Sequence, residues 1–252
     1  MSEAHAMRLT TIGTGAAAPS PARVQAGHLV EAGEVRLLLD CGSGVVHRMA
    51  ALGLDWAGIT HVALTHFHAD HVSDLATLIV AWRYGQLPPR AEPVTIVGPP
   101  GTAALLDRLA AALWTSLREP GFPLVVVELP RGAELALAPD VRLASHPVPH
   151  TAESVAYSVA RGGRRIVYTG DTAPDASLGP WAAGCDVLLA ECSLPAELAV
   201  PSHLTPEQVG DLAAAADPGR LVLTHFYPPV ERAAVRALVA SRWGGPVTLA
   251  HD

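Results

Sequence analysis

The sequence predicts an α/β fold arranged as a four-layer αββα sandwich. Three observations lead to this prediction: apolar periodicity yields two successive series of strands, helical patterns accompany both series, and half of the 252 residues are apolar. Helices flank strands in both halves, as two sheets packed face to face with each outer face covered would require. The length suits a single domain over residues 1–252 with a large buried core.

The elements of the first half are predicted from short apolar runs and from the helical patterns between them. Residues 59–65 (Ile-Thr-His-Val-Ala-Leu-Thr) form a buried strand, and residues 72–81 after it carry apolar side chains at helical spacing. We expect strands near residues 8–13, 26–31, 35–40, 60–64 and 94–97, and helices near 45–52, 72–83 and 101–117.

The second half is predicted in the same way. Gly162-Gly163 marks a turn between two strands, and Thr205-Pro206 has the form of a helix N-cap with proline at the first helical position. We expect strands near 124–128, 134–137, 141–148, 154–160, 164–169, 186–190, 220–223 and 246–250, and helices near 205–216 and 229–242. A doubly wound sheet is the alternative, but its phosphate loop is indicated only by Gly13-x-Gly15, which lacks the third glycine.

Four side chains that can bind metal lie within six residues, after the strand expected near 60–64. The run reads His66-x-His68-x-Asp70-His71. In an extended segment residues i and i+2 point the same way, so His66 and His68 can bind one ion together. Asp70 and His71 lie past the turn and can face a second ion. Imidazole and carboxylate ligands at this spacing indicate a two-metal hydrolase, whereas the alternative is a solvated histidine-rich loop.

Three further candidates each follow a predicted strand: His150, Asp171 and His225. A carboxylate at Asp171 could bridge two ions. A single histidine or aspartate after a strand is more often a cap or a satisfied polar residue. Their recurrence in one chain, together with the histidine run, predicts one shared metal centre.

This order of residues resembles the metallo-β-lactamase superfamily, whose hallmark is H-x-H-x-D-H followed by a His, a bridging Asp and a final His. Asp40, in the run Leu37-Leu-Leu-Asp-Cys-Gly42, is similar to the family's first motif, where an Asp hydrogen-bonds near the metal loop. The resemblance covers essentially the whole chain. It implies that one ion is bound by His66, His68 and His150, the other by Asp70, His71 and His225, and that Asp171 bridges both.

Within that superfamily the chain looks most like the ribonuclease Z branch of phosphodiesterases. The strand and Gly-x-Gly loop of residues 9–15 are similar to the start of that branch. In ribonuclease Z a Glu after a strand and a His in a His-Ser-Thr motif form a couple that protonates the leaving group. The resemblance assigns these roles to Glu191 and His203, with Leu204 replacing the Ser of the motif. The alternative is that His203 merely precedes the helix expected from residue 205.

The predicted reaction is hydrolysis by two divalent metal ions. The ions lower the pKa of a bridging water toward neutrality, and the resulting hydroxide attacks phosphorus. Asp70 is expected in the catalytic set with Glu191 and His203, and His203 donates a proton to the departing oxygen. Zinc is the favoured metal, with manganese and iron as alternatives, because nitrogen and oxygen ligands accept all three.

The expected substrate is an RNA or a small-molecule phosphodiester. Ribonuclease Z proteins that clamp tRNA usually carry a long arm between the third-motif His and the bridging Asp, and here only twenty residues separate His150 from Asp171. The chain is also acidic, with 17 Lys and Arg against 24 Asp and Glu. A nucleic-acid binder normally presents a basic face. Both observations argue against tRNA and leave a smaller phosphodiester in contention.

Two other functions stay open from the sequence alone. A hydrolase of the same fold that acts on a lactone or thioester would use the same metals without needing Glu191 and His203. A non-catalytic binding module would keep the fold, although the intact ligand set argues against it. An oxygen-handling iron protein would normally need a redox partner domain, and we recognise none here.

The cysteines and the apolar runs indicate the cellular setting. Cys41, Cys185 and Cys192 are odd in number and lack C-x-x-C spacing, so neither a disulfide framework nor a cysteine zinc site is expected. No apolar stretch reaches the ~20 residues that span a bilayer, and the start lacks the blocks of a signal peptide. These features favour the cytoplasm and no membrane. No protein partner is evident, and a homodimer is expected only from the resemblance.

Overall fold

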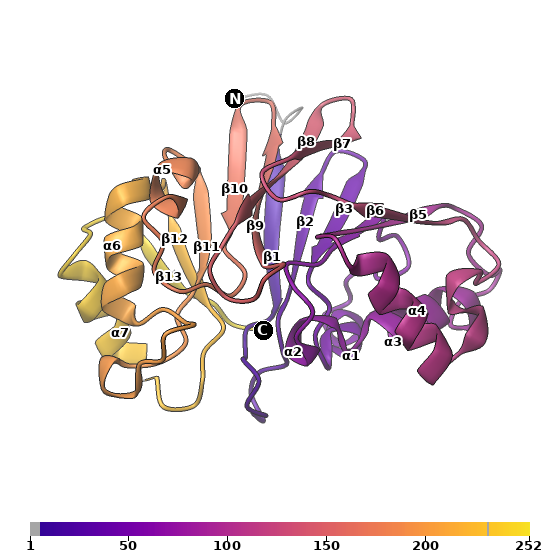
Figure 1. Ribbon diagram of the computed structural model, residues 1–252, viewed down its shortest axis with the longest axis horizontal. Coiled ribbons are helices and arrows are strands. Elements are labelled where there is room, and N and C mark those ends of the chain that lie inside the picture. Colours follow the sequence, from indigo (N-terminus) through magenta and orange to yellow (C-terminus); the bar gives the residue numbers. More distant parts are fainter. Residues whose placement is uncertain (1–5, 231) are drawn as a thin grey trace.

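The computed structural model of the protein describes residues 6–230 and 232–252. Two sheets face each other at the centre of the molecule, and helices lie on both outer sides (Figure 1). The predicted four-layer sandwich is confirmed. Among the described residues, no helix is both long and apolar enough to cross a membrane.

The first sheet contains six strands: β1 (Met7–Gly13), β2 (Gly27–Ala32), β3 (Val35–Leu39), β4 (His61–Ala63), β5 (Val94–Gly98) and β6 (Leu124–Glu128). They lie side by side in chain order, antiparallel from β1 to β3 and parallel from β3 to β6. The sequence grouped residues 124–128 with the second half, and this assignment is wrong. The helical segment between β5 and β6 returns the chain to the same sheet, where β6 pairs in parallel with β5.

The second sheet contains seven strands: β7 (Glu134–Ala138), β8 (Val141–Pro147), β9 (Val155–Arg161), β10 (Arg164–Tyr168), β11 (Val187–Glu191), β12 (Leu221–Thr224) and β13 (Val247–Leu249). Pairing is antiparallel from β7 to β10 and parallel from β10 to β13. Each sheet therefore has one antiparallel and one parallel half. Because parallel strands end at the same edge, the segments after β10, β11 and β12 lie together.

The helices cover the two outer faces (Figure 1). One side carries α1 (Val45–Ala51), α2 (Ala69–Val72), α3 (Leu75–Tyr84), α4 (Thr102–Ala112) and the 3₁₀ turn η2 (Thr115–Arg118). The other side carries α5 (Leu178–Ala182), α6 (Pro206–Ala216) and α7 (Arg232–Ala240), and a 3₁₀ turn η3 (Ala196–Leu198) precedes α6. Neither α5 nor η3 was expected from the sequence, and residue 231 of the helix expected at 229–242 lies outside the described residues.

The helix expected at residues 72–83 corresponds to α3, which begins at Leu75, and a break separates it from the short helix α2 that was not expected. Asp74 lies at the break, where its backbone N–H donates to the carbonyl of Cys41. Its carboxylate accepts a hydrogen bond from the backbone N–H of Val46, at the start of α1. These contacts fix the short helix α2 as a separate turn that carries part of the histidine run.

The core consists of three apolar layers, as a four-layer sandwich requires. Alternate residues of β3 separate them, since Leu38 packs under the helices of the first sheet while Leu37 and Leu39 pack between the sheets. In β11, Leu188 packs under the outer helices and Leu189 packs between the sheets. Strands buried on both faces read as continuous apolar runs, which explains why the sequence predicted them well.

Candidate metal centre

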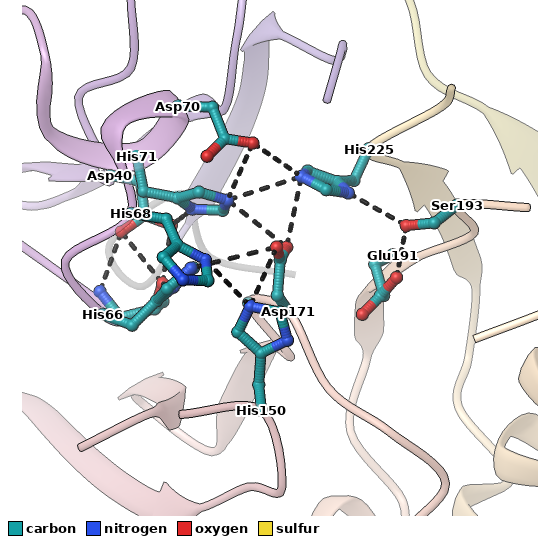
Figure 2. Close-up of polar contacts among 12 residues, drawn as sticks. Asp40, His66, His68, Asp70, His71, His150, Asp171, Glu191, Ser193 and His225 are labelled. Atoms are coloured by element: carbon teal, nitrogen blue, oxygen red, sulfur yellow. Dashed lines mark hydrogen bonds and ion pairs between the residues drawn. The ribbon is translucent and has the colours of Figure 1, made fainter. Parts of the chain in front are cut away.

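Seven histidine and aspartate side chains converge into two groups that share Asp171 (Figure 2). In each group one ligand atom per residue lies within 4.8 Å of all the others. The first group is His66, His68, His150 and Asp171, and the second is Asp70, His71, Asp171 and His225. These are the seven residues that the sequence singled out, and the structure gathers them into the two groups of side chains that the resemblance implied.

Strand ends and one short helix position the ligands. His66 follows β4, His68 has an extended backbone at the N-cap of α2, and Asp70 and His71 lie within α2. The remaining three follow β8, β10 and β12. The change from extended to helical backbone turns the first two histidines toward one group and the next two ligands toward the other.

Gly170 lets Asp171 approach the histidine run closely. Its φ is +56°, a left-handed conformation that glycine adopts without strain. A Cβ atom at this position would lie 2.9 Å from the side chain of Thr65, the residue before His66. Only glycine at position 170 therefore allows the segment that carries Asp171 to pack against Thr65, beside the histidine run.

The first group has the spacing of a small cation site. His150 Nε2 lies 3.0 Å from His68 Nδ1 and 3.7 Å from Asp171 Oδ2, while His66 Nε2 lies 3.9 Å from the same oxygen. Ligands held at 2.0–2.1 Å around a tetrahedral zinc ion are about 3.3 Å apart. Three imidazoles and one carboxylate at these separations can therefore converge on one ion with small adjustments.

The second group is more compact. His71 Nε2 and His225 Nε2 each lie 3.3 Å from Asp171 Oδ1, and the two nitrogens are 3.4 Å apart. Asp70 Oδ2 lies 3.4 Å from His225 Nε2. The first group faces Oδ2 of Asp171 and the second faces Oδ1, so this one carboxylate stands where it could bridge two ions.

Two orphaned atoms support a cation at this position. His66 Nε2 and Asp171 Oδ1 are buried and make no hydrogen bond among the described residues, and the contacts of Asp171 Oδ1 are the 3.3 Å ion pairs with His71 and His225. Buried polar atoms are nearly always paired, because desolvation without a partner costs about 1–3 kcal/mol. Both atoms point at the groups described above, and a divalent cation would complete their coordination. The donor set of nitrogen and carboxylate oxygen thus fits a pair of divalent ions.

The pKa shifts of His66, His150 and Asp171 favour the forms that bind metal. Burial, followed by the neighbouring charge of His71, holds the pKa of His66 well below its usual range. Burial likewise lowers the pKa of His150. Burial opposes ionisation of Asp171, yet the charges of His225 and His71 hold the pKa of this carboxyl well below its ordinary value. Neutral imidazole and ionised carboxylate are the forms that bind metal. His71 differs: burial opposes its charged form, but the carboxylates of Asp171 and Asp40 raise its pKa well above the usual value, so this ring must lose a proton to bind an ion.

Imidazole nitrogens that face away from the two groups also have hydrogen-bond partners. His71 Nδ1 lies 2.7 Å from Asp40 Oδ2, and His150 Nδ1 lies 2.9 Å from the carbonyl oxygen of Ser202. Asp40 also accepts hydrogen bonds from the backbone N–H of Thr65 at 2.8 Å and from the hydroxyl of Tyr168 at 2.9 Å. Asp40 thus makes the hydrogen bonds predicted for it beside the histidine run.

Glu191 and His203 form a pair directly beside the two groups. Glu191 ends β11, is fully buried and lies with Oε2 3.0 Å from His203 Nδ1. The same His203 nitrogen is 3.9 Å from Asp171 Oδ2. Burial disfavours the charged form of His203, but the hydrogen bond and charge of Glu191 outweigh it and raise its pKa. The structure therefore brings together the couple that the resemblance suggested.

Sequence reasoning missed two residues at this site. Ser193 contacts Glu191 Oε2 and lies 2.9 Å from His225 Nδ1, so it connects Glu191 to the second group (Figure 2). The ring of Tyr227 meets those of His203 and His225 edge-on, with centroid distances of 5.9 Å in both cases. The only signal in the sequence is proximity, because each lies two residues from a candidate already identified.

The segment between His150 and Asp171 contains no arm. It consists of a turn stabilised by Ser154 and of strands β9 and β10, which pair as a hairpin through Gly162-Gly163. The site is consequently bordered there by the sheet itself.

Known proteins share both the fold and the sequence pattern. Residues 35–226 match the family model described as a beta-lactamase superfamily domain. Ribonuclease Z of Mycobacterium avium (strain 104) is 32% identical over 277 aligned positions that cover 98% of this chain and 96% of the relative. The crystal structure of human tRNase Z, short form, is 26% identical, covers 97% of this chain and 96% of that one, and superposes with a TM-score of 0.78.

A further solved structure supports the fold alone. The metallo-beta-lactamase fold protein YhfI from Bacillus subtilis is 23% identical, covers 98% of this chain and 96% of its own, and has a TM-score of 0.84. The family match spans most of the chain, and the ribonuclease Z relative spans nearly all of it. The chain therefore belongs to the beta-lactamase superfamily, among its ribonuclease Z-like members.

Proposed function

We propose that this protein is a metal-dependent phosphodiesterase of the ribonuclease Z type. The observation that carries the proposal is the position of His203, whose Nδ1 lies 3.0 Å from Glu191 and 3.9 Å from Asp171. A protonated histidine beside a metal centre suits a reaction that must expel a poor leaving group. The relatives named ribonuclease Z support the same assignment.

The proposed centre holds two divalent ions, with zinc favoured by the histidine-rich ligand set. His66, His68 and His150 would hold one ion, Asp70, His71 and His225 the other, and Asp171 both. When bound, the ions supply a hydroxide nucleophile at neutral pH and neutralise charge on the phosphoryl oxygens. Asp171 would be the residue shared by both ions, because its two oxygens face different groups.

The general acid would be His203, oriented by Glu191. The hydrogen bond to Glu191 occupies Nδ1 and leaves Nε2 as the atom that gives a proton to the departing oxygen. Because Glu191 outweighs burial and raises the pKa of His203, the ring keeps its proton to a higher pH than an ordinary histidine does. Glu191 is itself held by the backbone N–H groups of Thr172 and Leu204, which fixes the direction of the couple.

The proposed substrate class is a phosphodiester, either in RNA or in a small molecule. The ribonuclease Z relatives support RNA, whereas the absence of an arm between His150 and Asp171 and the net charge of −7 favour a shorter ligand. A lactone or thioester would not need the acid couple. Substrate comparison with one protein preparation separates these cases.

The test is hydrolysis of bis(p-nitrophenyl) phosphate by zinc-loaded protein, run beside a precursor tRNA and a lactone. Asp171→Ala serves as the blank, and Asp211→Ala, on the outer helix α6, is the matched control. Phosphodiester turnover that is retained in the control and lost in the blank supports the proposal. Turnover of the lactone alone would overturn it, and the tRNA reaction tests whether RNA is a substrate without an arm.

A further inference from the structure

Ser193 occupies a buried position between the metal ligands and the acid couple. Its side chain is fully buried, two residues beyond the glutamate that ends β11. Its backbone N–H donates to the carbonyl of Leu204, and its carbonyl accepts from the N–H of Tyr227. The main chain of Ser193 thus joins the loop that carries His203 to the loop that follows His225.

The hydroxyl of Ser193 makes the same connection through side chains. Its Oγ is in close contact with Glu191 Oε2 and lies 2.9 Å from His225 Nδ1. It is 3.5 Å from His203 Nδ1, which is a longer contact than the 3.0 Å from that nitrogen to Glu191. Figure 2 shows Ser193 between His225 and Glu191, with dashed contacts to both.

The directions of these hydrogen bonds follow from the number of protons. A carboxylate only accepts, so the single hydroxyl proton of Ser193 is donated to Glu191. Toward His225 the hydroxyl can then only accept, which requires the proton of the neutral imidazole to be on Nδ1. The unprotonated Nε2 of His225 therefore faces Asp171 and Asp70, at 3.3 and 3.4 Å.

We propose that Ser193 is a positioning residue that fixes His225 in the tautomer able to bind metal. Ser193 donates its one hydroxyl proton to Glu191, so its oxygen can only accept the proton on His225 Nδ1. One carboxylate then serves two histidines, His203 directly and His225 through a hydroxyl. The other ligands offer a parallel, because Asp40 and the Ser202 carbonyl hold the far nitrogens of His71 and His150. Partners of this kind set ring orientation and ligand basicity in metal sites.

This inference rests on the proposed two-metal function, and its test measures zinc affinity rather than turnover. Apo protein is titrated with zinc against a chromophoric chelator to obtain two stepwise dissociation constants. Ser193→Ala is compared with Ser145→Ala, which removes a buried hydroxyl that donates to the Pro130 carbonyl and touches none of the seven ligands. Thermal unfolding of each apo variant reports folding.

We expect Ser193→Ala to weaken one zinc constant by about 10–100-fold, as loss of such a partner does elsewhere, and to leave the other within about threefold. Ser145→Ala should leave both constants unchanged. Two unchanged constants in Ser193→Ala would overturn the inference. Nitrogen-15 spectra of the wild-type histidines provide a second measurement that needs no variant, because a proton on Nε2 of His225 would also overturn it.

The outcomes separate this inference from the proposed function. If one zinc site depends on Ser193 and no phosphodiester is hydrolysed, the inference stands and the function fails. If phosphodiester turnover depends on Asp171 while Ser193→Ala leaves both zinc dissociation constants unchanged, only the inference fails. A wild-type protein that binds no zinc would overturn both.

Discussion

Replacing His203 by alanine tests the acid couple while leaving every metal ligand in place. General acid catalysis contributes about 10²–10⁴-fold, or roughly 3–5 kcal/mol of the activation barrier. The loss should appear only for substrates whose leaving oxygen needs a proton. We therefore expect His203→Ala to slow an alkyl phosphodiester by this factor and bis(p-nitrophenyl) phosphate, whose product leaves as a stable anion, by much less.

The structure also indicates that the variant will fold. Glu191 loses one partner but keeps hydrogen bonds from Thr172 N, Ser193 Oγ and Leu204 N. The lost hydrogen bond to a charged group corresponds to about 1.5–3 kcal/mol of unfolding free energy. Zinc content should be unchanged, because His203 belongs to neither group of four. Circular dichroism and metal analysis of the purified variant check both points.

The pH dependence follows from the raised pKa of His203. The ring is competent as an acid below this pKa and loses its proton as the pH rises through it, so the rate on the alkyl substrate should fall at a higher pH than the titration of an ordinary histidine would give. The pH–rate profile of His203→Ala should lack this fall, or limb, at high pH. The measurement is the steady-state rate of both proteins on the alkyl substrate between pH 5 and 10. Equal rates on the alkyl substrate, or an unchanged limb in the variant, would refute the acid assignment.

Three further variants test other parts of the structure. Asp171→Ala should release at least one zinc ion, measured by metal analysis after dialysis, and retention of two would contradict a bridging role. Asp252→Ala removes a buried carboxylate that accepts hydrogen bonds from the backbone N–H groups of Thr14 and Val24. Urea unfolding should show that the free energy of unfolding falls by about 3 kcal/mol, and a fall of under about 1 kcal/mol would contradict this role. Gly42→Ala places a Cβ 2.0 Å from the Asp70 carbonyl. The segment His66–His71 must then shift, and a displacement of about 1 Å costs about 100-fold in kcat. An unchanged kcat would show that the backbone accommodates the Cβ without moving these side chains.

The sequence predicted the elements whose signals are local. His66 and His68 are ligand candidates because of their spacing on an extended segment, and no distant residue is needed to see it. Central strands such as β3, β11 and β12 were anticipated because burial on both faces produces continuous apolar runs. Glu191 and His203 came only from the resemblance, and the structure brings them within hydrogen-bonding distance.

Tertiary structure decided the features that depend on which segments meet. It placed β6 beside β5, divided α2 from α3 at Asp74, and assigned the two oxygens of Asp171 to different groups. It also put Ser193 against His225, thirty-two residues away in the chain. A strand reveals its burial through its own composition, whereas its neighbour in a sheet and the partner of a single hydroxyl are chosen by packing over the whole chain. A one-dimensional pattern records the first kind of information and carries almost none of the second.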